Sequence, residues 1–85
     1  MAKVKIYTKS HCPYCEAAKR LLQAKGVSYE EIDVTDDFDK LAGLAGKTGH
    51  QTVPMIFIGE KFVGGFDELE ELEHSGKLEQ LLDQP

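Results

Sequence analysis

Apolar residues with alternating and helical spacing divide the first part of the chain into a strand, a helix and a second strand. Residues 3–8 alternate lysines with aliphatic side chains, and this period of two predicts a strand. From Pro13 onward, apolar residues recur at helical spacing until Gly26, which is expected to end the helix. Residues 27–34 again alternate apolar and acidic positions, which predicts a second strand. Two strands joined by a helix should be parallel, with a right-handed crossover.

The second part of the chain predicts a helix, a β-hairpin and one or two short helices. Residues 55–58 are apolar at every position, as in a central strand, and residues 61–63 return after a two-residue turn. The glycine pair 64–65 is expected to break the sheet, and residues 67–70 have the spacing of a capping box before a short helix. A last apolar repeat follows Gly76. The pattern predicts an α/β fold with a four-stranded mixed sheet and helices on both faces.

The helix between the second and third strands is the least regular element. Thr35 or Asp36 is expected to cap it, and Gly43 lowers its helix propensity by about 1 kcal/mol relative to alanine. We expect its apolar stripe to be buried against the sheet. That stripe comprises Phe38, Leu41, Ala42 and Ala45.

Length and charge narrow the function classes. We expect 85 residues to form one domain, residues 1–85, in a cytoplasmic protein, because no signal-peptide pattern or membrane-spanning apolar run is present. The net charge is −5, yet six of the ten basic residues and one of the fifteen acids lie within residues 1–25. This charge distribution gives no indication of nucleic-acid binding, since the net charge is negative and no stripe of basic and aromatic residues is present.

The two cysteines, Cys12 and Cys15, carry the strongest chemical signal. A Cys-x-x-Cys beside a strand–helix–strand pattern is typical of a thioredoxin-like redox motif. The alternatives are half of a zinc site or a structural disulfide, but one pair supplies only two of four zinc ligands and no second pair exists, so we expect no metal site. Cys12 stands where the helix begins, where N–H groups, the helix dipole and nearby Lys9 favour a thiolate. We therefore interpret Cys12 as the attacking sulfur and Cys15, one turn further, as a buried resolving thiol.

Three motifs together give a resemblance that covers essentially the whole chain. Cys12-Pro13-Tyr14-Cys15, Thr52-Val53-Pro54 and Gly64-Gly65-Phe66-Asp67, in this order and spacing, resemble those of a dithiol glutaredoxin of the small bacterial type. The resemblance implies a thioredoxin-like fold with strand order 2-1-3-4. It also implies glutathione-dependent reduction of protein disulfides and of glutathione mixed disulfides through the two cysteines.

The resemblance further implies that glutathione is a co-substrate, with no tightly bound cofactor. It implies a monomer without membrane or nucleic-acid partners. The expected partners are glutathione and proteins that carry disulfides or bound glutathione, with ribonucleotide reductase as one candidate.

The same resemblance implies a set of glutathione contacts. Pro54 is expected to follow a cis peptide bond, so that the Val53 backbone pairs with the peptide-like substrate. Asp67 and the N–H groups near it are expected to bind the γ-glutamyl end, whereas Lys9 and Gln51 would bind the glycine carboxylate. The complete set is Lys9, Tyr14, Gln51, Thr52, Val53, Pro54, Gly65, Phe66 and Asp67.

Three alternatives stay open at this point. Histidines are proton carriers at neutral pH, but we interpret His11, His50 and His74 as surface residues. A glutaredoxin-like protein reduced by a flavoprotein reductase would have no use for the clamp formed by residues 64–67. Some related glutaredoxins bind an iron–sulfur cluster between two chains. Those proteins usually have a single cysteine or lack the adjacent proline, so Pro13 disfavours such a cluster here.

Overall fold

The computed structural model describes residues 2–83, which fold around one mixed β-sheet. The strands have the order β2-β1-β3-β4; β1 and β2 are parallel, and the other neighbours are antiparallel. This arrangement confirms the expected thioredoxin-like sheet. In chain order, the elements are β1 (Val4–Thr8), α1 (Pro13–Ala24), β2 (Glu30–Asp33), α2 (Phe38–Thr48), β3 (Met55–Ile58), β4 (Lys61–Gly64), α3 (Phe66–His74) and α4 (Lys77–Leu82).

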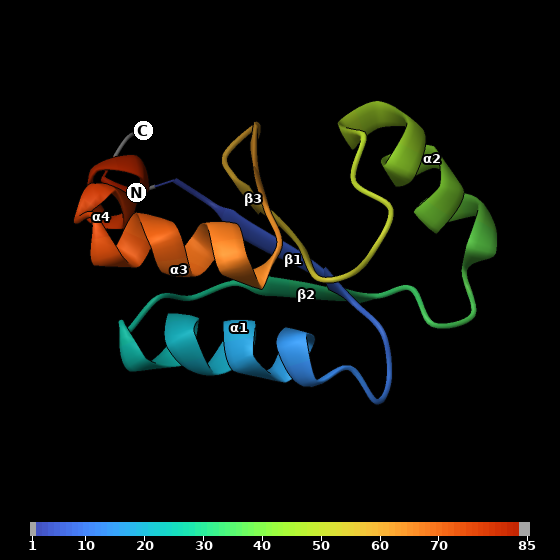
Figure 1. Cartoon of the computed structure of the whole chain (residues 1–85), viewed down its shortest axis with the longest axis horizontal. Helices are drawn as coiled ribbons and strands as arrows, with labels where there is room; N and C mark the ends of the chain where they lie inside the picture. Colours follow the sequence, from blue (N-terminus) through green and yellow to red (C-terminus); the bar gives the residue numbers. More distant parts are fainter. Residues whose placement is uncertain (1, 84–85) are drawn as a thin grey trace.

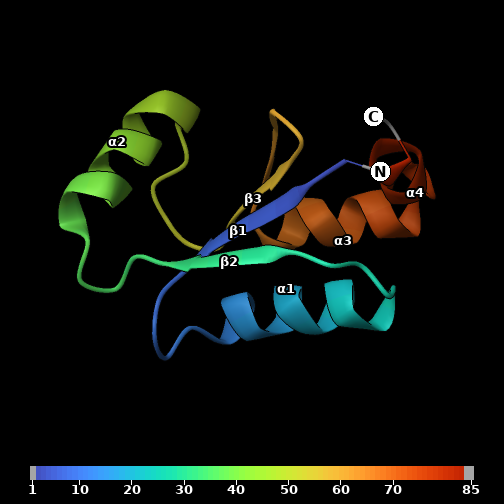
Figure 2. The ribbon, with the colours of Figure 1, turned by 180° about the vertical axis from the view of Figure 1, so that it is seen from behind.

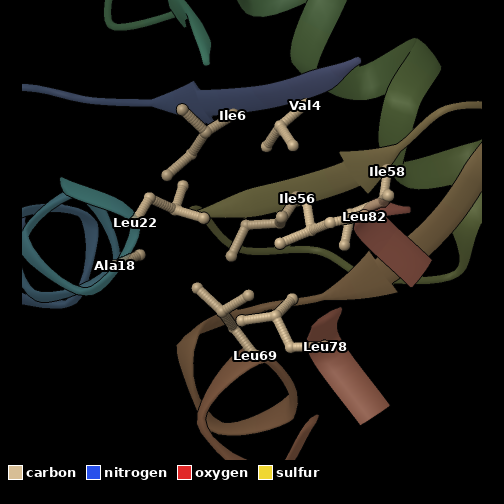
Figure 3. Close-up of a cluster of buried hydrophobic side chains, with 9 residues drawn as sticks. All are labelled: Val4, Ile6, Ala18, Leu22, Ile56, Ile58, Leu69, Leu78 and Leu82. Carbon is tan, nitrogen blue, oxygen red and sulfur yellow. The ribbon is translucent and has the colours of Figure 1, made fainter. Parts of the chain in front are cut away.

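Three helices cover one face of the sheet. Figures 1 and 2 show α1 and α3 running side by side, with α4 at the end of the molecule where β1 begins. Side chains of β1 and β3 that point to this face meet the apolar stripes of the three helices (Figure 3). The resulting core consists of Val4, Ile6, Ala18, Leu22, Ile56, Ile58, Leu69, Leu78 and Leu82.

The remaining helix, α2, lies on the side of the opposite face of the sheet (Figures 1 and 2). It stands apart from the other helices in both views and is joined to the sheet by extended segments (Figures 1 and 2). Leu44 and Lys47 of α2 line a groove with residues that β1 and β3 turn to this face, including Tyr7 and Phe57. None of the helices that the structure describes is long and apolar enough to cross a bilayer.

The strand β2 is shorter than the expected span of residues 27–34. It begins at Glu30, which pairs with Lys5 of β1, and it ends at Asp33, which pairs with Thr8. Val27 packs against the core from the preceding loop, and Val34, just past the strand, is buried. The apolar positions of the pattern were thus correct, but only part of them lies in the hydrogen-bonded ladder.

Two predictions about α2 were wrong. Its N-cap is Asp37, whose carboxylate accepts a hydrogen bond from the Lys40 N–H at 3.1 Å, whereas Thr35 is occupied by hydrogen bonds with Asp33. Its expected stripe is not buried, because α2 stands away from the sheet. Phe38 is 80% exposed, Ala42 is exposed, and Leu41 and Ala45 are only half-buried.

The start of α3 also differs from the prediction. The helix begins at Phe66 with Gly65 as its N-cap, so the capping box expected at residues 67–70 does not form. Instead, the Glu68 carboxylate accepts a hydrogen bond from the Gly65 N–H at 2.7 Å. Gly64 does not break the sheet but ends β4, where it pairs with Ile56 beside an irregular step in the register.

Candidate active site

The loop that follows β1 presents Cys12 at the start of α1. Its Ser10 N–H donates a hydrogen bond to the Thr35 hydroxyl at 2.8 Å, which ties this loop to the segment after β2. His11 has a φ of 57°, in the left-handed region that residues other than glycine adopt rarely. The chain therefore turns sharply just before the cysteine and enters the helix through Cys12 as N-cap and Pro13 as first helical residue.

Cys12 is half-buried, and its sulfur lies close to two backbone groups. It accepts a hydrogen bond from the Cys15 N–H at 3.2 Å and lies 3.9 Å from the Val53 carbonyl oxygen. The N-terminal N–H groups and the dipole of a helix stabilise negative charge at this position. Cys12 and Cys15 are both free thiols in this structure.

Cys15 has a different environment one turn away. Its side chain is completely buried, and burial, followed by its interaction with Cys12, raises its pKa from 9.0 to about 12. The Lys9 backbone and the Lys19 ammonium act in the opposite direction but are outweighed. At neutral pH Cys15 is therefore a protonated thiol, as the sequence pattern predicted.

A groove of about 270 Å³ lies along the turn before β3 and the start of α3. The Val53–Pro54 peptide bond at its base is cis, as expected. Seven of the nine predicted glutathione contacts line it. They are Tyr14, Thr52, Val53, Pro54, Gly65, Phe66 and Asp67.

The N-terminus of α3 forms one end of this groove. A Cβ atom at Gly65 would lie 3.4 Å from both the Pro54 carbonyl oxygen and the His50 Nε2, so the helix start is packed against the cis-proline turn and His50. Because the Gly65 N–H is held by Glu68, the N–H groups of Phe66 and Asp67 are the ones that a helix start leaves for a bound anion.

Tyr14 and Phe66 line one side of the groove, and His50 lines another part of it. The rings of Tyr14 and Phe66 lie 6.2 Å apart, centroid to centroid, and Tyr14 is 62% exposed. The His50 ring contacts Phe62 edge-on at 5.6 Å. Tyr14 and Phe66 thus give the groove one aromatic wall.

The structure does not bring every predicted residue to the groove. Lys9 and Gln51 are not among its lining residues, so their role at the glycine end of glutathione stays a prediction. His11 and His74 are exposed, as we interpreted them.

Two lining residues, His50 and Glu68, were missed as site residues. His50 is half-buried, and its Nε2 lies 3.4 Å from the Thr52 hydroxyl. Glu68 could have been found by counting three residues from Gly65 as N-cap, whereas nothing in the sequence marks His50.

The family model described as "Glutaredoxin" matches residues 4–63, which include both cysteines and the cis-proline turn. The chain belongs to the glutaredoxin family. A glutaredoxin of Pseudomonas aeruginosa is 52% identical over 82 residues, which cover 96% of this chain and 98% of that protein. Glutaredoxin 3 of Escherichia coli K12 is 45% identical over 82 residues, covering 96% and 99% of the two chains.

Among solved glutaredoxins, the structure of a buckwheat glutaredoxin–glutathione complex is similar, with a TM-score of 0.90 and 36% identity. The match covers 95% of this chain and 76% of the buckwheat chain. Glutaredoxins are thiol–disulfide oxidoreductases that depend on glutathione, and the Cys12–Cys15 pair places this chain among those with two cysteines in the motif.

Proposed function

We propose that this glutaredoxin reduces both glutathione mixed disulfides and protein disulfides, with Cys12 as the nucleophile and Cys15 as the resolving thiol. The proposal depends mainly on one observation, the position of the Cys12 sulfur. That sulfur caps α1 and lies 3.9 Å from the Val53 carbonyl, beside a groove of tripeptide size. Cys15 is buried and protonated at neutral pH, so it is unsuited to make the first attack.

In the proposed monothiol route, the Cys12 thiolate attacks the glutathione sulfur of a mixed disulfide. The Cys12–glutathione disulfide forms as the bond to the substrate protein breaks, and the protein sulfur leaves as a thiolate and takes up a proton. A second glutathione thiolate then attacks the glutathione sulfur of this intermediate, releases glutathione disulfide and restores the Cys12 thiolate. No group other than glutathione is consumed.

In the proposed dithiol route, Cys12 first forms a mixed disulfide with a protein substrate. Cys15 then attacks the Cys12 sulfur, and the second substrate sulfur leaves reduced. Two glutathione molecules return the Cys12–Cys15 disulfide to two thiols. Protein substrates that carry an accessible disulfide or a bound glutathione fit this route, and ribonucleotide reductase is one candidate. We place the reaction in the cytoplasm, where such thiols stay reduced.

The groove suggests how glutathione would lie. Asp67 and the N–H groups of Phe66 and Asp67 suit the ammonium and carboxylate of the γ-glutamyl end. Within residues 2–83 the Val53 N–H makes no backbone hydrogen bond, so it is available to the central peptide group. Tyr14 would cover the sulfur, and Lys9 and Gln51 would reach the glycine carboxylate from outside the groove.

The proposal is tested by turnover of a small glutathione mixed disulfide with glutathione and glutathione reductase. Cys12→Ser is expected to abolish turnover, whereas Cys15→Ser should keep this reaction and lose reduction of a protein disulfide. Turnover by Cys12→Ser would refute the assignment. Reduction by a thioredoxin reductase, but not by glutathione, would instead favour the flavoprotein-linked alternative.

A further inference from the structure

A cluster of charged side chains lies one helical turn after Cys15 on α1. Lys19 follows Cys15 by four residues in α1, so the two side chains share one face of the helix. The Lys19 ammonium is 2.8 Å from a Glu16 carboxylate oxygen and 3.1 Å from a carboxylate oxygen of Glu31 on β2. The Lys19 side chain is only 18% exposed, which limits its screening by solvent.

This cluster is anchored to the sheet beneath the active site. The Thr8 hydroxyl donates a hydrogen bond to the same Glu31 oxygen at 2.8 Å. Thr8 is 1% exposed and ends β1 immediately before the loop that carries Cys12. Side chains from α1, β1 and β2 therefore hold the ammonium on the side of α1 that also carries Cys15.

We infer that Lys19 is a positioning residue for the dithiol route, whose ammonium stabilises the Cys15 thiolate when that thiol attacks. The inference rests on the proposed function. In the step concerned, Cys15 loses its proton to solvent and its thiolate attacks the Cys12 sulfur of a mixed disulfide. The Cys12–Cys15 bond forms, the bond from Cys12 to the substrate breaks, and the substrate thiolate leaves and takes up a proton.

The electrostatics of the cluster support this role. Burial and Cys12 raise the Cys15 pKa; the Lys9 backbone lowers it, and the charge of Lys19 lowers it further. Hydrogen bonds to Glu16 and Glu31 raise the pKa of Lys19, so the ammonium keeps its charge throughout the pH range in which the enzyme would work. Hydrogen bonds from Thr35 lower the pKa of Asp33 on β2, and the charge of Lys19 adds to this effect.

The expected size of the effect follows from thiol reactivity. If the loss of the ammonium makes Cys15 a tenfold weaker acid, its thiolate fraction falls about tenfold at neutral pH. The more basic thiolate is about threefold more nucleophilic, since the Brønsted coefficient is about 0.5, so closure slows about threefold.

A matched control exists at the other end of α1. Lys25 also bridges two carboxylates, at 2.6 Å to Glu79 and 3.1 Å to Glu73, with its side chain 24% exposed. Lys19→Gln and Lys25→Gln therefore remove equivalent ion pairs, of which only the first is near Cys15. Lys19→Arg should keep the rate within about twofold of wild type because the charge remains.

A second variant, Glu16→Gln, should change the rate of closure by Cys15 in the opposite direction to Lys19→Gln. Glu16→Gln removes a negative charge that partly neutralises Lys19, while Glu31 still holds the ammonium. Closure should become faster, by up to about twofold. A purely structural cluster would instead respond to Glu16→Gln and Lys19→Gln in the same direction.

The experiment is a stopped-flow reaction of each reduced protein with a chromogenic aryl disulfide. The first release of aryl thiol reports the attack by Cys12, and the second reports closure by Cys15. We expect Lys19→Gln to slow the second phase about threefold across pH 6–8 and to leave the first unchanged. Lys25→Gln should match wild type in both phases.

Equal second phases in Lys19→Gln and Lys25→Gln would overturn the inference, as would a slower second phase in Glu16→Gln. These outcomes are distinguishable from failure of the proposed function itself. In that case the first phase would be missing in the wild type or would survive in Cys12→Ser.

Discussion

The two faces of the sheet are built very differently. The face under α1, α3 and α4 encloses nine mutually packed core residues, and Figure 3 shows their side chains pointing toward one another from five elements. On the opposite face, α2 buries no residue completely and leaves Phe38 80% exposed. Figure 1 shows the same contrast in the ribbon, where α2 is set apart from the other helices.

The contrast between the two faces shows which parts of the candidate active site belong to elements packed in the core. The start of α1, which carries Cys12, and the start of α3, which forms one end of the groove, both belong to helices that pack in the core. The third part of the groove, from His50 to Pro54, is the segment that leads from α2 back into β3. The groove thus combines the ends of two core-packed helices with a segment that follows α2, the helix with no fully buried residue.

The largest expected effect is on stability and tests whether the packed face carries the fold. Leu22 is completely buried among the core residues, so Leu22→Ala removes apolar contacts and leaves a cavity. We expect it to lower the free energy of unfolding by about 3 kcal/mol, measured by urea denaturation. The control on the other face is Phe38→Ala, which should change stability by less than about 0.5 kcal/mol. Similar losses in both variants would mean that α2 packs on the sheet in solution.

The second prediction concerns the close packing of β4 against α3. Gly64 has a φ of 127°, and a Cβ atom there would lie 2.6 Å from the Glu68 carboxylate oxygen and 2.7 Å from its Cγ. Gly64→Ala should therefore cost about 2 kcal/mol of stability and weaken glutathione binding, because Glu68 would release the Gly65 N–H. Denaturation and calorimetric titration with glutathione measure the two effects.

Gly43 is the matched glycine on the loose face. It lies within α2, and a Cβ atom there would meet nothing within 4 Å. Gly43→Ala should raise stability by about 0.5–1 kcal/mol, since alanine favours the helix. If both glycine variants changed stability in the same direction, the contrast between the two faces would be wrong.

The last prediction uses pH to test the burial of Cys15 on the packed face. The Cys15 pKa is about 12 in the folded protein and 9.0 without burial, so the folded state holds this proton more tightly. Its contribution to stability is complete below pH 9 and is lost as pH rises from 9 toward 12. Between pH 8 and 10, the wild type should lose about 1 kcal/mol more than Cys15→Ala, in reducing buffer.

Lysines do not interfere with that comparison. The raised pKa values of Lys19 and Lys25 also favour the folded state, but their contributions decline only above about pH 10.5. Parallel pH profiles for wild type and Cys15→Ala would contradict the burial of this thiol.

The sequence by itself determined the order of the elements, the strand order expected from the family resemblance, and most of the groove. Local signals were sufficient where one residue type is required, as at Pro13 in the first turn of α1 and at Gly26, where φ is 71°. The cis-Pro54 bond and the burial of Cys15 were also predicted correctly.

Only the tertiary structure decided which apolar residues are buried and which polar groups meet. Periodicity assigned Phe38 to the core, but burial depends on how close α2 comes to the sheet, and a local pattern carries no such information. The lining of the groove by His50 and the contact of Lys19 with Glu31 likewise join elements distant in sequence. Spacing along one element specifies a face, whereas contacts between elements depend on the packing of the whole chain.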